Sequence, residues 1–315
     1  MASKPTIIFN PFAKSEKAGV LWYELYKACA GGAKIKLTKG PGNATKKAAK
    51  AAKNGVPVIV AAGGDGTINE VLNGMMGSGA ALGIIPVGSV NVLARELKIP
   101  LTVPEAWKVI EAGVTQDFDV VEVEYHVDDE PRTRYFIQLA GIGLDAHIVS
   151  KVTWEKKRRW GPLSYVFESF RAITQTLPSI TLRIDGGEEI EASFALIGNG
   201  SFYGGPFPVF HKASMTDGQL DVCIFQSSGY LDLLIYLQAI ARGVQHSTKG
   251  ILYHHGATVE IRSASRVPIE LDGEFAGHLP ARMKVLPKAL KICVPGSDVS
   301  KPELRAEISE NFVSK

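Results

Sequence analysis

The stretch VPVIVAAGGDGTINEVLNGM, residues 56–75, joins an apolar run, a turn of three glycines around one aspartate, and a segment with helical spacing. The run VIVAA predicts a buried strand, and TINEVLNGM predicts a helix directly after the turn. In an open α/β sheet, ligands collect at the carboxyl ends of the strands, where such turns lie. Glycines let backbone N–H groups approach a phosphate, and a helix N-terminus favours an anion. The stretch therefore predicts a phosphate-binding turn, with a plain turn and helix cap as the alternative.

This turn differs from the two common nucleotide-binding fingerprints. The pattern GDGTIN lacks the third glycine of GxGxxG, and the chain contains no GxxxxGK[ST]. A second turn of the same kind lies in IIPVGSVNVLARELKIP, residues 84–100, where Ser89 and Asn91 are small hydrogen-bonding groups. Asn10 ends a further apolar run, TIIF. Three strand ends therefore offer polar groups to one ligand.

The chain has two textures. From residue 5 to about 115, short apolar runs alternate with helix-like stretches, which predicts a parallel sheet built from βαβ units. From about residue 117, period-2 and β-branched runs are split by Gly, Asp and Pro turns, which predicts a mostly antiparallel β domain. Longer helices are expected near residues 162–176 and 229–242, and a final helix over 301–313.

These textures predict an α/β protein of two domains. We expect a nucleotide-binding domain over residues 1–118, to which residues 293–315 return, and a β-rich substrate domain over 119–292. A chain of 315 residues with 45% hydrophobic and 21% charged content can form two cored domains, and extended disorder is excluded.

Charge and cysteine content exclude several classes of function. The net charge of +3 is too small to indicate a nucleic-acid partner. Three widely separated cysteines exclude a disulfide framework or a zinc site. The first apolar run is too short for a signal peptide, and no run approaches the length of a membrane span. We expect a cytoplasmic protein whose membrane contact, if present, is peripheral and on the inner face.

Four motifs together resemble the diacylglycerol kinase catalytic family, which includes bacterial lipid kinases and sphingosine and ceramide kinases. They are the strand-end Asn10-Pro11, GGDGTINEVLNG, PVGSVNVLAR, and LDGE at residues 271–274. The resemblance extends from Asn10 to about Pro295 and implies an N-terminal nucleotide domain, a C-terminal β-sandwich, and ATP in the cleft between them. It also implies Mg²⁺-dependent transfer of the γ-phosphoryl group of ATP to a hydroxyl of diacylglycerol or a similar lipid alcohol.

The resemblance assigns roles to residues of this chain. Asp272 or Glu274 would act as the base, and Asp65 would have a Mg²⁺-linked role at the phosphates. Asp217, with carbonyls near Ser214 and Gln219, would hold a structural Mg²⁺, and a solvated turn acid is the alternative. The nucleotide contacts would come from Asn10, Pro11, Thr38, Gly63, Gly64, Asp65, Gly66, Thr67, Ile68, Asn69, Gly88, Ser89 and Asn91.

Two departures from the family pattern leave alternatives open. Val92 stands where the family often has an aspartate, and the first loop reads NPFAKSEKAG instead of a compact NPxSG. An NAD kinase-like enzyme is the nearest enzymatic alternative, although PVGSVN and LDGE favour the lipid branch. An ATP-binding lipid sensor with weak or no turnover is the alternative from another class. A homodimer is also left open.

Three further segments have two readings each. Residues 151–170 combine Lys156, Lys157, Arg158 and Arg159 with two tryptophans, and suit an anionic membrane surface or an ordinary solvated basic face. The pair His254-His255 lacks metal-like spacing and is read as ordinary surface or core residues. FYGGPFPVF, residues 202–210, is read as a rigid loop that helps to line the acceptor pocket.

Overall fold

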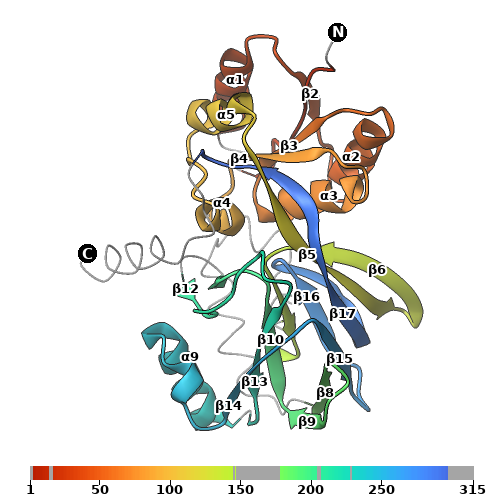
Figure 1. The fold of residues 1–315 in the computed structure, drawn as a ribbon, viewed down its shortest axis with the longest axis vertical. Coiled ribbons are helices and arrows are strands. Elements are labelled where there is room, and N and C mark those ends of the chain that lie inside the picture. The colour runs from red at the N-terminus through yellow and green to blue at the C-terminus, as the bar shows by residue number, and fades with distance from the viewer. Residues whose placement is uncertain are drawn as a thin grey trace. The chain divides into compact units, whose positions relative to one another are not determined.

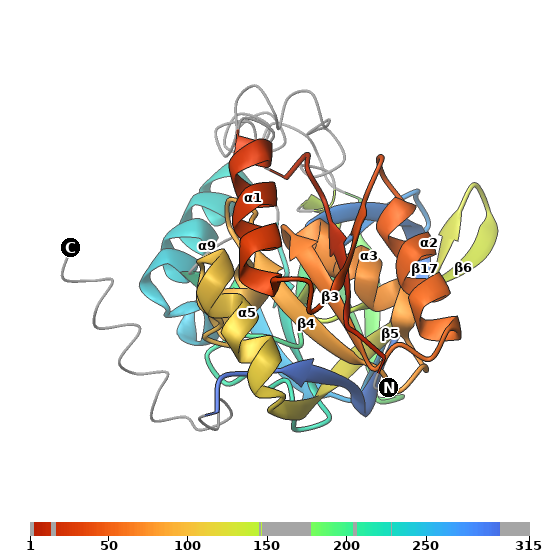
Figure 2. The ribbon, with the colours of Figure 1, turned by 90° about the horizontal axis from the view of Figure 1, so that it is seen from above.

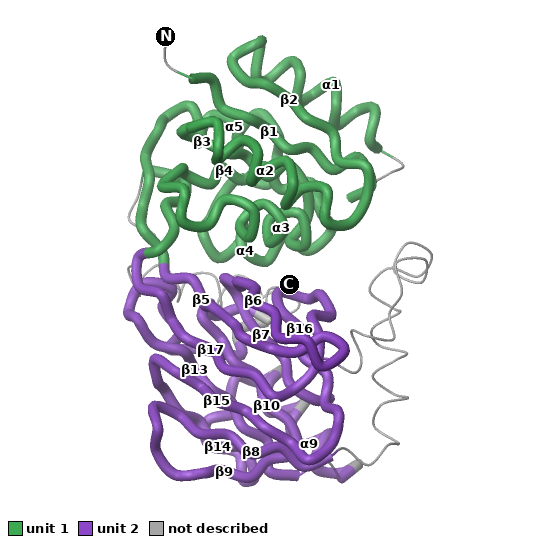
Figure 3. Tube along the Cα trace, turned by 90° about the vertical axis from the view of Figure 1, so that its right-hand side faces the viewer, with its two compact units in different colours: residues 1–118, 289–315 green, residues 119–288 purple. Residues whose placement is uncertain are grey.

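The computed structural model describes residues 3–13, 17–144, 146, 178–203, 207–227 and 229–296, and Figure 1 shows their helices and strands. The chain divides into two compact units, residues 1–118 with 289–315 and residues 119–288 (Figure 3). The helices expected over 162–176 and 301–313, and the basic segment 151–170, lie outside the described residues.

Unit 1 contains the parallel sheet that the alternating texture predicts. Every residue of strands β3 (Val58–Gly63) and β4 (Ala81–Pro86), apart from Val58, is buried, because helices cover both faces of the sheet. The register places Ile8 beside both Lys36 and Ala61. The strands run in the order β4-β3-β1-β2 and comprise β1 (Thr6–Phe9), β2 (Lys34–Leu37), β3 (Val58–Gly63) and β4 (Ala81–Pro86).

Helices α1 and α5 lie on one face of this sheet and α2 and α3 on the other (Figure 2). Helices α2 and α3 pack closely at Gly74, where a Cβ atom would lie only 2.3 Å from the Thr45 carbonyl oxygen. The absence of a side chain at Gly74 allows this approach. Helix α5 is not among the predicted helices, although Val103, Ala106, Trp107 and Ile110 bury one of its faces. The helices are α1 (Ala18–Cys29), α2 (Asn43–Lys53), α3 (Asp65–Met75), α4 (Val92–Glu96) and α5 (Val103–Ala112).

Unit 2 is the mostly antiparallel β domain that the second texture predicts. Two chains of pairing, β14-β13-β10-β7-β16-β17 and β17-β15-β8-β9, are antiparallel throughout, and β5 pairs with β6 and β17. Strands β9 and β14 are not among the predicted strands. The strands are β5 (Thr115–Val127), β6 (Glu130–Phe136), β7 (Leu139–Ile142), β8 (Ile180–Ile184), β9 (Glu189–Ala192), β10 (Phe194–Gly198), β11 (Phe202–Tyr203), β12 (Phe207–Pro208), β13 (Leu220–Phe225), β14 (Ile251–Gly256), β15 (Thr258–Arg262), β16 (Pro268–Leu271) and β17 (Glu274–Cys293).

Helix α9 (Tyr230–Arg242) occupies the place of the helix predicted over residues 229–242, and a short 3₁₀ turn, η2 (Gln245–Ser247), follows it. Its inner face packs on an aromatic cluster in which the Phe194 and Phe225 rings stack with centroids 4.2 Å apart. The last residues of β17 pair in parallel with β4 of unit 1, at Lys291 and Ile292. Among the described helices, none has the length and apolar character needed to cross a bilayer.

Candidate functional site

The two predicted glycine turns, after β3 and after β4, lie against each other in unit 1. The Gly64 carbonyl accepts the first hydrogen bonds of α3 from the backbone N–H groups of Thr67 and Ile68, at 2.9 and 3.1 Å. A Cβ atom at Gly88 would lie 2.5 Å from the Gly64 Cα atom, a distance that no side chain tolerates. Glycine is therefore required where the two turns meet, because only a residue without a Cβ atom lets their backbones come this close.

The end of β1 joins these turns through Asn10. Its side-chain amide donates to the Thr67 hydroxyl at 2.9 Å, and its carbonyl oxygen accepts from the backbone N–H of Phe12 at 3.0 Å. A Cβ atom at Gly63 would lie 2.4 Å from the Thr67 side chain, so this position also requires glycine. The structure thus brings together the polar groups of β1, β3 and β4. Thr38 follows the neighbouring strand β2, and its N–H donates to the Phe9 carbonyl at 2.8 Å.

Asn91 carries a buried acceptor at the second turn. Its backbone is left-handed, with φ of 55°, and its side-chain amide donates to the Gly88 carbonyl at 2.8 Å. The other side-chain atom, Oδ1, is buried and accepts no hydrogen bond within the protein. Such an oxygen suits a ligand donor, because buried polar atoms are normally paired. Ser89 lies exposed on the same turn.

Asp65 is the first residue of α3, where a carboxylate is favoured by the helix N-terminus. Gly66 and Thr67 follow in the first turn of the helix. The side chains of Ile68 and Asn69 are buried, and Asn69 accepts from the Asn73 side-chain amide at 2.9 and 3.1 Å.

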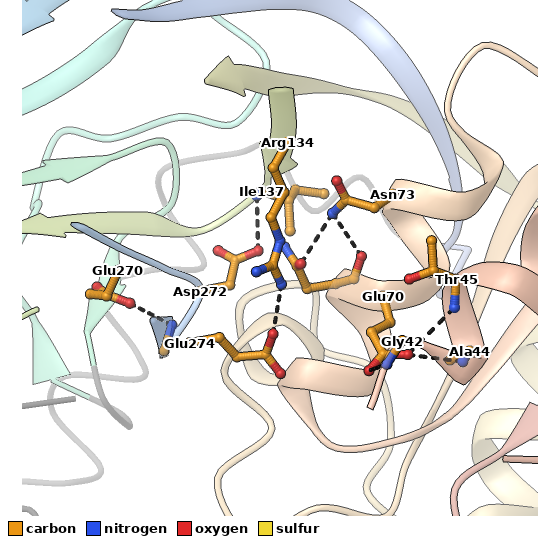
Figure 4. Close-up of polar contacts among 12 residues, drawn as sticks. Gly42, Ala44, Thr45, Glu70, Asn73, Arg134, Ile137, Glu270, Asp272 and Glu274 are labelled. Atoms are coloured by element: carbon orange, nitrogen blue, oxygen red, sulfur yellow. Dashed lines mark hydrogen bonds and ion pairs between the residues drawn. The ribbon is translucent and has the colours of Figure 1, made fainter. Parts of the chain in front are cut away.

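Glu70, within the GGDGTINE motif, has a role that sequence reasoning missed. Its carboxylate accepts from the backbone N–H groups of Gly42 and Ala44, each at 2.8 Å, and of Thr45 at 3.4 Å (Figure 4). The N-cap of α2 is Gly42, which has no side chain to satisfy these donors. Glu70 therefore caps α2 from α3 and holds the loop that follows Thr38. A residue 25 or more positions away gives no local capping signal.

In unit 2, the Asp272 carboxylate of the LDGE turn is bound by backbone amides. It accepts from the N–H groups of Ile137, Gln138 and Leu139 at 3.1, 2.9 and 3.2 Å, and Figure 4 shows the first of these bonds. Its own N–H donates to the Leu139 carbonyl at 2.9 Å, and its φ is 49°. The first two amides belong to the connection between β6 and β7, and the third belongs to the first residue of β7. Asp272 thus fastens this connection to the LDGE turn.

Glu274, two residues later, is placed differently. Its carboxylate lies 2.6 Å from the Arg134 guanidinium, and its side chain keeps 38% of its surface exposed (Figure 4). Arg134 lies on β6, where its side chain is 20% exposed, and no motif marks it in the sequence. Of the two LDGE acids, Glu274 is held by a side-chain ion pair and Asp272 by backbone amides.

The predicted structural metal residues share one turn of unit 2. The Asp217 N–H donates to the Ser214 carbonyl at 3.4 Å, and Asp217 accepts from the Gln219 N–H at 3.0 Å. Desolvation raises the pKa of the Asp217 carboxyl, and the nearby Asp119 carboxylate raises it further. Buried Asp119, missed in the sequence, accepts from the Gly218 and Lys288 N–H groups, both at 2.7 Å. Oxygen donors beside two carboxylates fit a hard cation.

Among the described residues, no group of three or more His, Cys, Asp or Glu side chains forms a metal-binding cluster. The histidine pair lies on β14, where His255 approaches the buried Asp221 carboxylate at 3.2 Å. The same carboxylate accepts from the Tyr253 hydroxyl at 2.6 Å, and desolvation together with this bond raises the pKa of Tyr253.

Comparison with known families matches both parts of the chain. Residues 4–123 match the diacylglycerol kinase catalytic domain, and residues 139–294 match the YegS C-terminal NAD kinase beta sandwich-like domain. Residues 4–123 therefore form a domain of the diacylglycerol kinase catalytic domain family. This result confirms the resemblance drawn from GGDGTINE and LDGE.

Several known proteins align with this chain over most of its length. A diacylglycerol kinase of Staphylococcus aureus (strain JH9) is 28% identical over 332 residues, covering all of both chains. One of Staphylococcus haemolyticus is 29% identical over 272 residues, covering 85% of this chain and 79% of that protein. A Bacillus anthracis str. Sterne crystal structure, provisionally assigned as a diacylglycerol kinase, has TM-score 0.77 and 25% identity, covering 93% and 96% of the two chains.

Proposed function

We propose that this protein is an ATP- and Mg²⁺-dependent lipid kinase. It transfers the γ-phosphoryl group of ATP to a hydroxyl of diacylglycerol or a similar lipid alcohol. The observation that carries the proposal is the pair of glycine turns, Gly64 against Gly88, with Asp65 at the start of α3 and the unpaired Asn91 oxygen beside them.

The first unit supplies the nucleotide contacts in this proposal. Backbone N–H groups of the glycine turns and the N-terminus of α3 favour the phosphates. Asn10 fixes Thr67 at the same place, and Thr38 follows on the loop that Glu70 holds. Asp65 would hold Mg²⁺, which neutralises phosphate charge when bound. A carboxylate at a phosphate site fits such a cation, since it would otherwise repel the nucleotide.

The second unit supplies the acid–base chemistry. The oxygen of the lipid hydroxyl bonds to the γ-phosphorus while Glu274 accepts the proton of that hydroxyl. At the same time the bond between the γ-phosphorus and the bridging oxygen breaks, and ADP leaves. Arg134 orients the Glu274 carboxylate through their ion pair. Asp272 contributes by fixing the turn, because its oxygens are already bound by three amides.

The same proposal includes a structural metal site, a location in the cell and an oligomeric state. The Asp217 turn, with the Ser214 and Gln219 carbonyls, would hold a structural Mg²⁺. A lipid acceptor places the working enzyme at a membrane surface, and ATP places it on the cytoplasmic face. The homodimer stays a prediction.

An NAD kinase-like activity is the second candidate. A yeast NADH kinase structure complexed with NADH shares the fold, with TM-score 0.54 at 11% identity over 99% of this chain. This likeness concerns the fold alone. The LDGE turn and PVGSVN favour the lipid acceptor.

The test measures ADP release from ATP and Mg²⁺ with dioleoylglycerol in mixed micelles or with NAD⁺ as acceptor. We expect turnover with the lipid and none with NAD⁺. Asp65→Asn should lower the lipid rate by about 10²-fold or more with only a small fall in the melting temperature, because it removes one charge from the phosphate site and from the start of α3. Phosphorylation of NAD⁺ in place of the lipid would contradict the proposal. Near-normal activity of the variant would remove Asp65 from the mechanism.

A further inference from the structure

Gln138 is a buried amide without a partner. Its residue is 4% exposed, and neither its Oε1 nor its Nε2 atom forms a hydrogen bond with the described part of the chain. The oxygen and the nitrogen of a buried side-chain amide normally both form hydrogen bonds. Burial removes their hydrogen bonds to water, and leaving them unreplaced costs free energy. An apolar side chain of similar length would avoid this penalty. The amide therefore indicates a ligand that supplies both a donor and an acceptor.

This amide lies at the junction that Asp272 fastens. The Gln138 N–H donates to Asp272 Oδ1 at 2.9 Å, and its carbonyl accepts from the N–H groups of Asn199 and Gly200 at 2.8 and 3.0 Å. A Cβ atom at Gly200 would lie 2.0 Å from Gln138 Oε1. The backbone on both sides is thus fixed, and the amide is held against a glycine that leaves it room.

Asn199 adds another unpaired atom at the same junction. It is fully buried, and its amide nitrogen donates to the carbonyls of Ile137 and Asp119 at 2.7 and 3.1 Å. Its Oδ1 accepts no hydrogen bond. The junction between β6, β7 and β10 therefore offers two acceptors and one donor, each from a neutral amide.

The chemistry of these groups selects the class of ligand. A hydroxyl both donates and accepts, so it can bond to Oε1 and Nε2 of one amide. A phosphate is anionic and offers mainly acceptors at neutral pH, and the Asp272 carboxylate, which accepts from the Gln138 N–H, would oppose it. The ligand that fits is a neutral alcohol with a second oxygen nearby, such as the free hydroxyl and adjacent ester of a glycerolipid.

We propose that Gln138 binds the hydroxyl-bearing end of the acceptor lipid, with Asn199 Oδ1 as a further acceptor, and so determines which alcohol is accepted. Gln138 Oε1 accepts from the lipid hydroxyl, and Nε2 donates to the neighbouring lipid oxygen. This inference rests on the proposed function for the identity of the ligand. The Gln138 side chain has three rotatable bonds, which allow its amide to turn toward an entering ligand.

The decisive variant is Gln138→Leu, which keeps the side-chain volume and removes both polar atoms. We expect a melting temperature equal to or above that of the wild type, because an unpaired buried amide is replaced by an apolar group. We also expect kcat/KM for dioleoylglycerol to fall about 10- to 100-fold, while KM for ATP stays within about 3-fold. A packing residue would not combine unchanged stability with loss confined to one substrate.

Two companion variants sharpen the test. Gly200→Ala should displace the Gln138 amide and weaken binding of the acceptor lipid, as Gln138→Leu does. Gln245→Leu is the matched control, since Gln245 is also fully buried in unit 2 with an unpaired Oε1, and donates to the Val209 carbonyl. It should lower the melting temperature and leave KM for the acceptor unchanged.

A binding measurement separates this inference from the proposed function. Equilibrium binding of dioctanoylglycerol, without ATP, should weaken in Gln138→Leu relative to the wild type. If the wild type binds the lipid but transfers no phosphate, the kinase proposal fails and the Gln138 inference stands. The inference is overturned if the wild type does not bind dioctanoylglycerol, or if Gln138→Leu keeps wild-type lipid affinity and kcat/KM. Parallel loss of stability, ATP affinity and lipid affinity would equally overturn it.

Discussion

Asp272 and Glu274 stand two residues apart in LDGE, yet their carboxylates have different surroundings. Asp272 accepts three backbone hydrogen bonds, whereas Glu274 forms an ion pair with Arg134 and keeps part of its surface in solvent. The sequence predicts the two acids as alternatives for one role. The contacts separate them, because a carboxylate with its lone pairs already bound is a poor acceptor for a substrate proton.

Glu274→Gln and Asp272→Asn should therefore fail in different ways. Glu274→Gln removes the proton acceptor and should lower kcat by about 10²- to 10⁴-fold, with little change in the melting temperature. Asp272→Asn turns an NH₂ group toward backbone donors and should destabilise the fold by about 1–3 kcal/mol. Denaturant unfolding and steady-state kinetics on the same preparations measure both effects.

Arg134→Gln gives a matched control for the ion pair, because it leaves the Glu274 carboxylate in place. It should lower kcat less than Glu274→Gln does. Equal activity of Glu274→Gln and the wild type on the true acceptor would exclude Glu274 as the base. A fully stable Asp272→Asn protein would exclude the fastening role of Asp272.

Among the elements, α2 depends on a residue of α3. Glu70→Ala removes the acceptor of three N–H groups at the start of α2 and should destabilise unit 1 by about 1–3 kcal/mol. It should also raise KM for ATP, because the loop after Thr38 loses its anchor. Glu24→Ala is the control, since no hydrogen bond or ion pair involves the Glu24 carboxylate in the described part of the chain. Equal melting temperatures for both variants would contradict the capping role.

The close approach of α2 and α3 gives a second prediction at this scale. Gly74→Ala places a methyl group 2.3 Å from the Thr45 carbonyl oxygen and should destabilise the protein by about 1–3 kcal/mol. Gly19→Ala, on α1, meets no atom within 4 Å and should stabilise by up to about 1 kcal/mol through helix propensity. Thermal unfolding of the two variants measures the contrast. A neutral Gly74→Ala would show that the two helices are separable.

Elements with strong local periodicity could be predicted from the sequence, and the others could not. The β3 strand and α3 helix follow from VIVAA and TINEVLNGM, because the change of period falls at the glycine turn. The run RYFIQLAG reads as one strand but divides into β6 and β7, since the Ile137 and Gln138 amides bond to Asp272. Strand β14 is not predicted from the sequence, because two adjacent histidines interrupt its apolar pattern. In the structure one of them, His255, lies 3.2 Å from the Asp221 carboxylate on the neighbouring strand.

At the scale of the whole molecule, the predicted fold class and family are confirmed, and the residues missed at the site share one property. Glu70, Arg134 and Asp119 contact partners far away in sequence, brought near by strand register and helix packing. Motif spacing carries no information about such pairs. The roles assigned to the predicted site residues, and the division into a nucleotide-binding domain and a substrate domain, stay predictions.

The measurement that tests the central claim most directly is the fate of the γ-phosphate. The purified protein is incubated with Mg²⁺ and ATP labelled at the γ-phosphorus, together with diacylglycerol, monoacylglycerol, ceramide, sphingosine, phosphatidylglycerol or undecaprenol, and the lipid fraction is extracted. The account predicts that label enters a lipid alcohol as a phosphate monoester, with diacylglycerol or a close analogue as the best acceptor, and that Asp65→Asn abolishes the incorporation. Bound ATP with no label in any lipid would contradict it and indicate a nucleotide-binding sensor instead.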